Sequence, residues 1–118
     1  MEEYKWFESA QDDLKTAEDN ITLRHYKWAC FQAQQATEKA LKSLLIKNTK
    51  KFPKIHDLVE LAKLVHAPQE IIISCGKLNP HYVVARYPDF SENYSKEDAH
   101  YFVKIAGEIV QWTKKNLN

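Results

Sequence analysis

The segment HYVVARYPDF, residues 81–90, gathers the residue types best suited to binding an anion. Arg86 stands beside Tyr87 and close to Asp89, and Tyr82 precedes it by four residues. A guanidinium is a planar, permanently charged fork that matches a phosphate or a carboxylate, and a tyrosine face can stack on a nucleobase. The segment therefore predicts a binding site for a phosphate or a carboxylate.

A plainer interpretation of this segment needs no ligand. Arg86 can pair with an acid of its own loop, Asp89 or Glu92, and so pin that loop to the fold. Structural ion pairs of this kind are common in proteins. From these residues alone, both interpretations stay open.

A second segment, KIHDLVEL, places His56 beside Asp57 at the start of an expected helix. A histidine base needs an acid that orients it, but adjacent helical side chains point about 100° apart and cannot form that pair directly. Helix capping, or a hydrogen bond to a distant backbone group, is therefore the favoured interpretation. Ligand binding by His56 is the alternative.

Polar residues also mark the less apolar side of an expected helix in the segment QAQQATEKALKSLL. Together with the lysines that follow, they form a basic edge that could approach phosphates. The residues are Gln32, Gln35, Lys39, Lys42, Lys47, Lys50, Lys51 and Lys54. A solvated helix face is the simpler interpretation, because Glu38 and Lys42 have the ordinary i,i+4 spacing of an exposed ion pair.

These side chains must be positioned by helices, because apolar residues recur three or four positions apart along the chain, without the sustained alternation of strands. We expect a first helix from Trp6 to Ile21, a second over residues 29–45, a third that begins near Ile55, a fourth whose first residue is Pro68, and a last one capped by Ser95 and Asp98.

The second expected helix has a wide buried face made largely of small side chains. These are Ala29, Ala33, Ala36 and Ala40. Small residues let neighbouring helix backbones approach closely, so this helix should lie at the centre of a bundle. The lysine-rich segment 47–54 that follows should be an exposed linker that ends at Pro53.

The composition excludes several classes of protein. The 118 residues carry a formal net charge of +1, so no overall field draws the protein onto nucleic acid or an anionic membrane. The start, MEEYKWF, does not resemble a secretory signal, and no apolar run approaches the roughly 18 residues that span a bilayer. Cys30 and Cys75 lie far apart, which predicts two buried free thiols and no metal site. We expect one cytoplasmic domain over residues 1–118, with no cofactor and no membrane contact.

Five segments, in this order, resemble the HEPN domain, a family of small helical nucleotide-binding domains found in prokaryotes and higher eukaryotes. They are WFESAQDDLKTAE, ACFQAQQATEKALKSLL, IHDLVELA, RYPD with the tyrosine before it, and DAHYFVKIAGEIVQW, and together they run from Trp6 to Trp112. The resemblance implies an all-α, up-and-down bundle of four or five helices. It also implies a homodimer, often encoded beside a minimal nucleotidyltransferase in a toxin–antitoxin arrangement.

Many proteins of this family are ribonucleases whose motif is an arginine followed, after four to six residues, by a histidine. The histidine can take the 2′-hydroxyl proton of RNA while the arginine stabilises charge on the phosphate. In this chain the corresponding positions after Arg86 hold Ser91, Glu92 and Asn93. Cleavage would therefore need His81, which precedes Arg86, or a histidine of the other subunit.

The resemblance to the family and the missing histidine after Arg86 together predict a non-catalytic module. This module would bind a nucleotide or an RNA phosphate and act with a nucleotidyltransferase partner. The expected ligand-binding residues are Arg86, Tyr82, Tyr87, Asp89, His56 and Lys39. The alternative is a metal-independent ribonuclease that uses Arg86 with His81. A third possibility is an interaction scaffold whose exposed tyrosines serve only a dimer contact.

Overall fold

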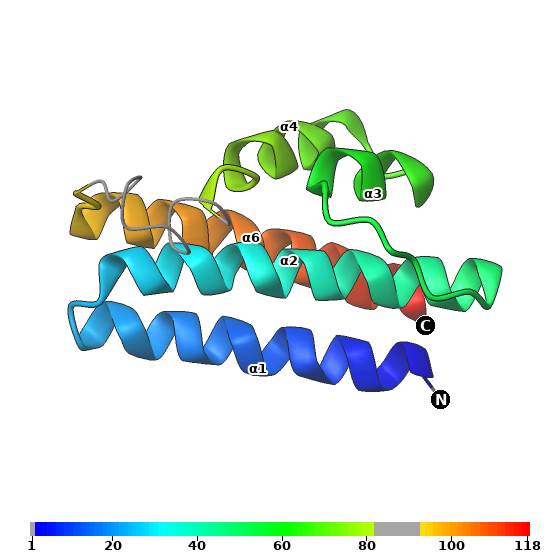
Figure 1. Ribbon diagram of the computed structural model, residues 1–118, viewed down its shortest axis with the longest axis horizontal. Helices are drawn as coiled ribbons and strands as arrows, with labels where there is room; N and C mark the ends of the chain where they lie inside the picture. The colour runs from blue at the N-terminus through cyan, green and yellow to red at the C-terminus, as the bar shows by residue number, and fades with distance from the viewer. Residues whose placement is uncertain (1, 82–92) are drawn as a thin grey trace.

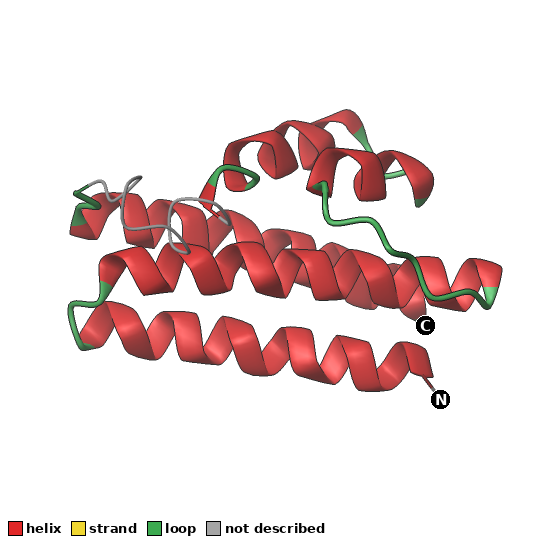
Figure 2. Ribbon diagram, in the orientation of Figure 1, coloured by secondary structure: helices red, strands yellow, loops and turns green. Residues whose placement is uncertain are grey.

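The computed structural model describes residues 2–81 and 93–118, and every regular element in these ranges is an α-helix (Figure 1 and Figure 2). The helices are α1 (Glu2–Thr22), α2 (Tyr26–Thr49), α3 (Leu58–Leu64), α4 (Gln69–Leu78) and α6 (Lys96–Leu117). The prediction of an all-α fold is therefore confirmed. Within the described ranges, no helix combines the length and the apolar character needed to cross a membrane.

Three long helices, α1, α2 and α6, lie side by side, and the shorter α3 and α4 pack together across one side of them (Figure 1). Helix α2 runs antiparallel to α1 and contacts both α1 and α6. Helix α6 begins at the end of the bundle where α1 turns into α2, so α6 runs in the same direction as α2.

The central place of α2 follows from its small side chains, as predicted. Ala29, Ala33, Ala36 and Ala40 have no exposed surface. Two hydroxyl residues are also fully buried in this helix, and Thr37 donates its hydroxyl to the backbone oxygen of Ala33 at 3.0 Å. A buried hydroxyl that is satisfied within its own helix does not interrupt the contact with a neighbouring helix.

The first two helices are longer than predicted. Helix α1 begins at Glu2, and α2 continues to Thr49, through the first residues of the segment predicted as a linker. Lys47 lies in this extension, and its Nζ donates to the backbone oxygens of Leu117 at 2.6 Å and Asn116 at 3.2 Å. The last carbonyls of α6 have no partner within that helix, so the ammonium group of Lys47 takes this role and donates to them. Its positive charge also balances the negative end of the α6 dipole.

The starts of α3 and α4 also differ from the prediction. Helix α3 begins at Leu58, rather than near Ile55, because the carboxylate of Asp57 accepts two backbone N–H groups of its first turn at 2.8 and 3.2 Å. Asn79 joins this cap from the end of α4, donating to Asp57 at 3.1 Å and accepting from the N–H of Leu58 at 2.8 Å. Pro68 is the N-cap of α4 and not its first helical residue.

Each of the turns that end α1, α2 and α3 contains a basic residue with a positive φ. The angles are 64° at Arg24, 61° at Lys50 and 58° at His66. After α1, the N–H of Arg24 donates to the oxygen of Ile21 at 3.0 Å, and the next N–H donates to that of Asn20 at 2.8 Å. This left-handed cap favours glycine, but a basic side chain there complements the negative end of the helix.

The capping box predicted for the last helix is present. The Ser95 hydroxyl accepts the backbone N–H of Asp98 at 3.0 Å, and the Asp98 carboxylate accepts the backbone N–H of Ser95 at 3.0 Å. This hydrogen bond from the Ser95 backbone holds the pKa of Asp98 below its usual value. The backbone N–H of Glu60, followed by the Asn79 amide, lowers the pKa of Asp57 in the same way.

We expect the two caps to make the protein sensitive to acid. A carboxylate whose folded-state pKa is lowered contributes stability above its ordinary pKa and loses it as the pH falls through the lowered value, here below about pH 4. The variant Asp57→Asn/Asp98→Asn keeps an oxygen that can accept each N–H but removes the titration. Its melting temperature should fall less than that of the wild type between about pH 5 and pH 2.

The control is Glu18→Gln, which removes an exposed carboxylate from α1. Its melting temperature should follow the wild-type curve. Parallel curves for the wild type and the double variant would show that the caps do not contribute to the acid sensitivity.

Candidate functional site

The predicted ligand-binding residues, and His81 of the ribonuclease alternative, fall into two groups. One group lies outside the residues that the structure describes, so its role stays a prediction: Tyr82, Arg86, Tyr87 and Asp89. The structure does describe Lys39, His56 and His81, and it places them in three separate environments. Of these, His56 belongs to the most extensive polar network in the described part of the molecule.

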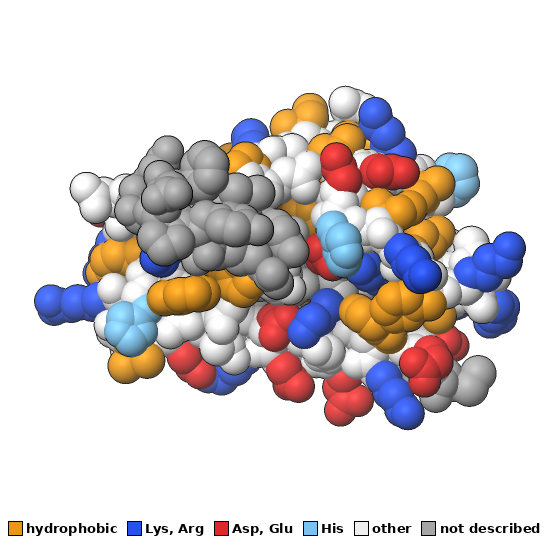
Figure 3. Space-filling view, viewed as in Figure 1, with side chains coloured by type: hydrophobic (Ala, Val, Ile, Leu, Met, Phe, Trp, Pro, Cys, Tyr) orange, Lys and Arg blue, Asp and Glu red, His pale blue; other side chains and the backbone are white. Residues whose placement is uncertain are grey.

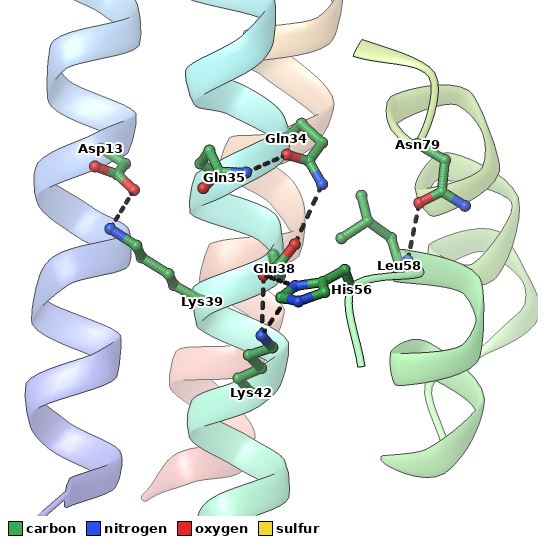
Figure 4. Close-up of polar contacts among 9 residues, drawn as sticks. All are labelled: Asp13, Gln34, Gln35, Glu38, Lys39, Lys42, His56, Leu58 and Asn79. Carbon is green, nitrogen blue, oxygen red and sulfur yellow. Dashed lines mark hydrogen bonds and ion pairs between the residues drawn. The ribbon is translucent and has the colours of Figure 1, made fainter. Parts of the chain in front are cut away.

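His56 lies against α2, where it meets Glu38 and Lys42 (Figure 4). Its Nδ1 is 3.0 Å from Oε2 of Glu38 and 3.4 Å from Nζ of Lys42. Lys42 Nζ and Glu38 Oε2 are themselves 3.0 Å apart. We call these three residues the α2 cluster. His56 thus bonds side chains of α2, while the helix capping predicted for this segment is confirmed at Asp57, the N-cap of α3.

The ion pair of the α2 cluster is buried, so the prediction of an ordinary solvated pair is wrong. The exposed fraction of the side chain is 3% for Lys42 and 9% for Glu38, against 65% for His56. In the sequence, i,i+4 spacing on a polar face suggests exposure. Burial comes from residues remote in the sequence, which cover this part of α2.

Two aromatic rings form the cover over Lys42. The Trp6 ring comes from α1, and the Phe52 ring comes from the segment between α2 and α3. Lys42 Nζ lies 5.8 Å from the centroid of each ring, and the two centroids are 4.9 Å apart with the planes tilted by 60°. The ring faces attract the ammonium group and exclude water, which strengthens its attraction to Glu38.

A chain of amide hydrogen bonds continues the network along α2 (Figure 4). Gln35 donates to the side-chain oxygen of Gln34 at 2.6 Å, and Gln34 reaches Oε1 of Glu38 at 3.5 Å. Both oxygens of the Glu38 carboxylate therefore have partners. A fully paired network of this kind is what allows charge to remain in a protein interior.

Lys39 stands apart from the α2 cluster and contacts α1. Its Nζ is 2.8 Å from Oδ2 of Asp13 and donates to Oγ of Ser9 at 2.9 Å. The side chains of Lys39 and Asp13 are about one quarter exposed, at 27% and 25%. These contacts link α1 to α2, so a ligand that used Lys39 would have to compete with Asp13.

His81 is sealed inside the fold. Its exposed fraction is 7%, its Nδ1 is 2.9 Å from the hydroxyl of Tyr94, and its ring centroid is 4.1 Å from that of Phe102. Burial lowers the pKa of His81, which favours the neutral imidazole. Its Nε2 is buried and has no hydrogen-bond partner among the residues described.

The two thiols are buried and unpaired, as predicted. Burial raises the pKa of both Cys30 and Cys75 to about 12, so neither carries the thiolate that nucleophilic chemistry requires. In the described ranges, no group of three histidine, cysteine, aspartate or glutamate side chains comes together to hold a metal ion.

Sequence reasoning missed Glu38 as the partner of His56 and Tyr94 as the partner of His81. Glu38 carried a weak signal, because its position is polar although it lies between the small buried residues of the central helix. Tyr94 carried none, since its partner precedes it by 13 positions in the chain. No periodicity relates residues that meet across a loop.

We expect Lys42→Met to destabilise the protein by about 3 kcal/mol or more, because it leaves the buried Glu38 carboxylate without its cation. The double variant Glu38→Leu/Lys42→Met should recover much of that loss, since apolar residues tolerate burial. Urea unfolding of the single and double variants measures both effects.

The exposed pair of Lys15 and Asp19 is a matched control. It has the same i,i+4 spacing and a distance of 2.7 Å, but its side chains are 71% and 56% exposed. Lys15→Met should cost less than about 0.5 kcal/mol. Equal losses for Lys15→Met and Lys42→Met would show that burial does not set the strength of the α2 cluster.

Solved structures share this arrangement of helices. TT1696 from Thermus thermophilus is 27% identical, with a TM-score of 0.89 over 97% of each chain. ST0689, described as an archaeal HEPN homologue, is 29% identical, with a TM-score of 0.84 over 98% of each chain.

Comparisons of sequence point the same way. A protein of Methanocaldococcus jannaschii named "Putative toxin MJ1304" is 29% identical over 126 aligned positions, which cover 92% of this chain and 83% of that protein. The sequence model of the HEPN domain matches residues 4–117. Because that match spans nearly the whole chain, the protein belongs to the HEPN domain family.

Proposed function

We propose that this protein is a HEPN module that binds a nucleotide or an RNA phosphate without cleaving it and acts with a minimal nucleotidyltransferase in a toxin–antitoxin type of system. The observation that carries the proposal is the family match over residues 4–117 combined with the absence of histidine at positions 91–93. The toxin name of the archaeal relative supports the proposed biological setting.

Arg86 would be the anion-binding group of this module. Its guanidinium can donate two parallel hydrogen bonds to a phosphate, and the hydroxyls and rings of Tyr82 and Tyr87 can shape the pocket around a nucleotide. Cleavage of RNA needs in addition a base that removes the 2′-hydroxyl proton. Ser91, Glu92 and Asn93 do not supply an imidazole for that step.

The environment of His81 supports the non-catalytic proposal over the ribonuclease alternative. A general base must come within hydrogen-bond reach of the proton that it removes. His81 is 7% exposed, and its Nδ1 is already engaged with the hydroxyl of Tyr94. Catalysis by Arg86 with His81 would therefore require the protein to open around the histidine.

A homodimer is part of the proposal. In the described part of the chain, several large hydrophobic side chains are exposed: Tyr4, Leu23, Trp28, Phe52, Leu64, Ile73 and Tyr101. Trp28 is 45% exposed and packs edge to face on Phe31 at 5.8 Å. Aromatic residues at a surface are typical of protein interfaces, because they bury a large area with little loss of conformational freedom.

We expect Arg86→Ala to reduce the affinity for single-stranded RNA or a nucleotide at least about tenfold, the effect of losing one charge-assisted, bidentate contact. Arg86→Lys keeps the positive charge but loses the bidentate guanidinium geometry. Its affinity should lie between those of the alanine variant and the wild type. Fluorescence anisotropy with a labelled oligoribonucleotide measures this.

Incubation of the same RNA with purified protein separates the two candidate functions. No cleavage by the wild type is expected. Cleavage that disappears in both Arg86→Ala and His81→Ala would contradict the non-catalytic proposal and establish the ribonuclease. If RNA and nucleotides do not bind to the wild type at all, the binding proposal is wrong.

Sedimentation velocity tests the dimer. At micromolar concentration the protein should sediment as a particle of twice the 13.8 kDa chain mass. A dilution series serves as the control, because a genuine equilibrium shifts toward monomer on dilution. A monomer throughout the micromolar range would remove the homodimer from the proposal.

A further inference from the structure

A pocket of about 370 Å³ lies where α1 turns into α2 and α6 begins. These parts of the chain meet at one end of the bundle (Figure 1). It is lined by Ile21, Thr22, Arg24, Tyr26, Lys96 and His100. Three elements thus contribute: the last turn of α1, the turn and first residue of α2, and the first two turns of α6. The volume is within the range of sites that hold small molecules.

The pocket has a strongly basic lining. Arg24, Lys96 and His100 are exposed, and within the described ranges their side chains make no hydrogen bond or ion pair. Among the described residues no carboxylate lines the pocket, whereas the pocket between α4 and α6 contains Glu70 and Glu108. Uncompensated cations that converge on one cavity are a typical arrangement for binding an anion.

Nearby acids do little to neutralise this lining. Asp19, in the last turn of α1, lies 2.7 Å from the ammonium group of Lys15. Asp98, in the first turn of α6, accepts the backbone N–H of Ser95 in the capping box. Glu97 is exposed and is not among the lining residues. The cations of the pocket therefore remain available to a ligand.

The visible face of the molecule has no strong charge of one sign (Figure 3). Acidic and basic side chains are intermixed over most of the face in Figure 3, as a net charge of +1 predicts. At the left-hand end, which holds the turn from α1 to α2, a basic and a histidine side chain lie beside hydrophobic ones. Local attraction of an anion is thus possible without an overall positive field.

The backbone holds Arg24 at this place. Its φ of 64° and the hydrogen bonds that close α1 fix the position of its Cα. Lys50 and His66 occupy equivalent turns, so a basic residue there has a general benefit from the helix dipole. Arg24 differs from them because the ammonium group of Lys96 and the imidazole of His100 reach the same pocket from α6.

We propose that Arg24, Lys96 and His100 form a binding site for a phosphate group from described residues alone. The guanidinium can bind two phosphate oxygens, while the lysine ammonium and an imidazole N–H donate to the others. The half-buried ring of Tyr26 forms an aromatic wall beside them, against which a base can stack. The ligand is the phosphate of a nucleotide or of an RNA strand, a class that rests on the proposed function.

The test is Arg24→Gly/Lys96→Ala, because glycine is favoured at a positive φ and this change does not threaten the fold. The control Lys50→Gly/Lys104→Ala makes the same backbone change after α2 and removes an exposed lysine of α6. Both proteins should be folded in circular dichroism spectra. We expect the pocket variant to lose at least about tenfold in affinity for phosphate probes, and the control to lose little.

The probes separate the possible sources of the phosphate. They are inorganic phosphate, adenosine monophosphate, and one single-stranded oligoribonucleotide with and without a 5′-phosphate, measured by calorimetry at about 0.1 M salt. Dependence on the 5′-phosphate assigns the site to a terminal or free nucleotide phosphate. Equal loss with both oligoribonucleotides assigns it to the strand backbone. Either result supports the inference.

Comparison with Arg86→Ala distinguishes this inference from the proposed function. Binding that is lost in Arg86→Ala but equal to the wild type in Arg24→Gly/Lys96→Ala overturns the pocket alone. Binding that is lost only in the pocket variant supports the pocket and contradicts the role of Arg86. If no probe binds to the wild type, both proposals are wrong.

Discussion

The buried ion pair between Lys42 and Glu38 is the constraint on which the arrangement of the other elements depends. Two charges can stay inside a protein only if they are paired and shielded. Here the shielding comes from Trp6 of α1 and from Phe52, while His56 adds a third polar partner. Helix α1 and the segment between α2 and α3 must therefore both pack against the same part of α2.

The start of α3 follows from that packing. The side chain of His56 packs against α2, and the next residue, Asp57, is the N-cap of α3. The α2 cluster therefore also sets where α3 begins. Asn79 then joins the end of α4 to the same cap. Through these contacts a central helix made of small residues determines where the α3–α4 pair sits, and hence where the chain reaches His81.

An anion-binding site needs cations that lack partners within the fold. Lys39, Lys42 and Lys47 all looked available in the sequence, but the structure pairs them with Asp13, with Glu38 and with the last carbonyls of α6. A paired cation stabilises the fold and offers little to a ligand. The side chains around the turn after α1 are different, because their charges converge on a cavity that no acid of the described ranges lines.

The sequence by itself determined the helices, their main caps and the family, because these depend on short-range patterns: the alanines of α2, the capping box at Ser95 and the ordered HEPN-like segments. Only the tertiary structure decided that the Glu38–Lys42 pair is buried and that Arg24 shares a pocket with Lys96. The burial of the ion pair and the meeting of Arg24 with Lys96 both depend on contacts between residues far apart in the chain. Helical periodicity states which face a residue occupies, but not what covers that face.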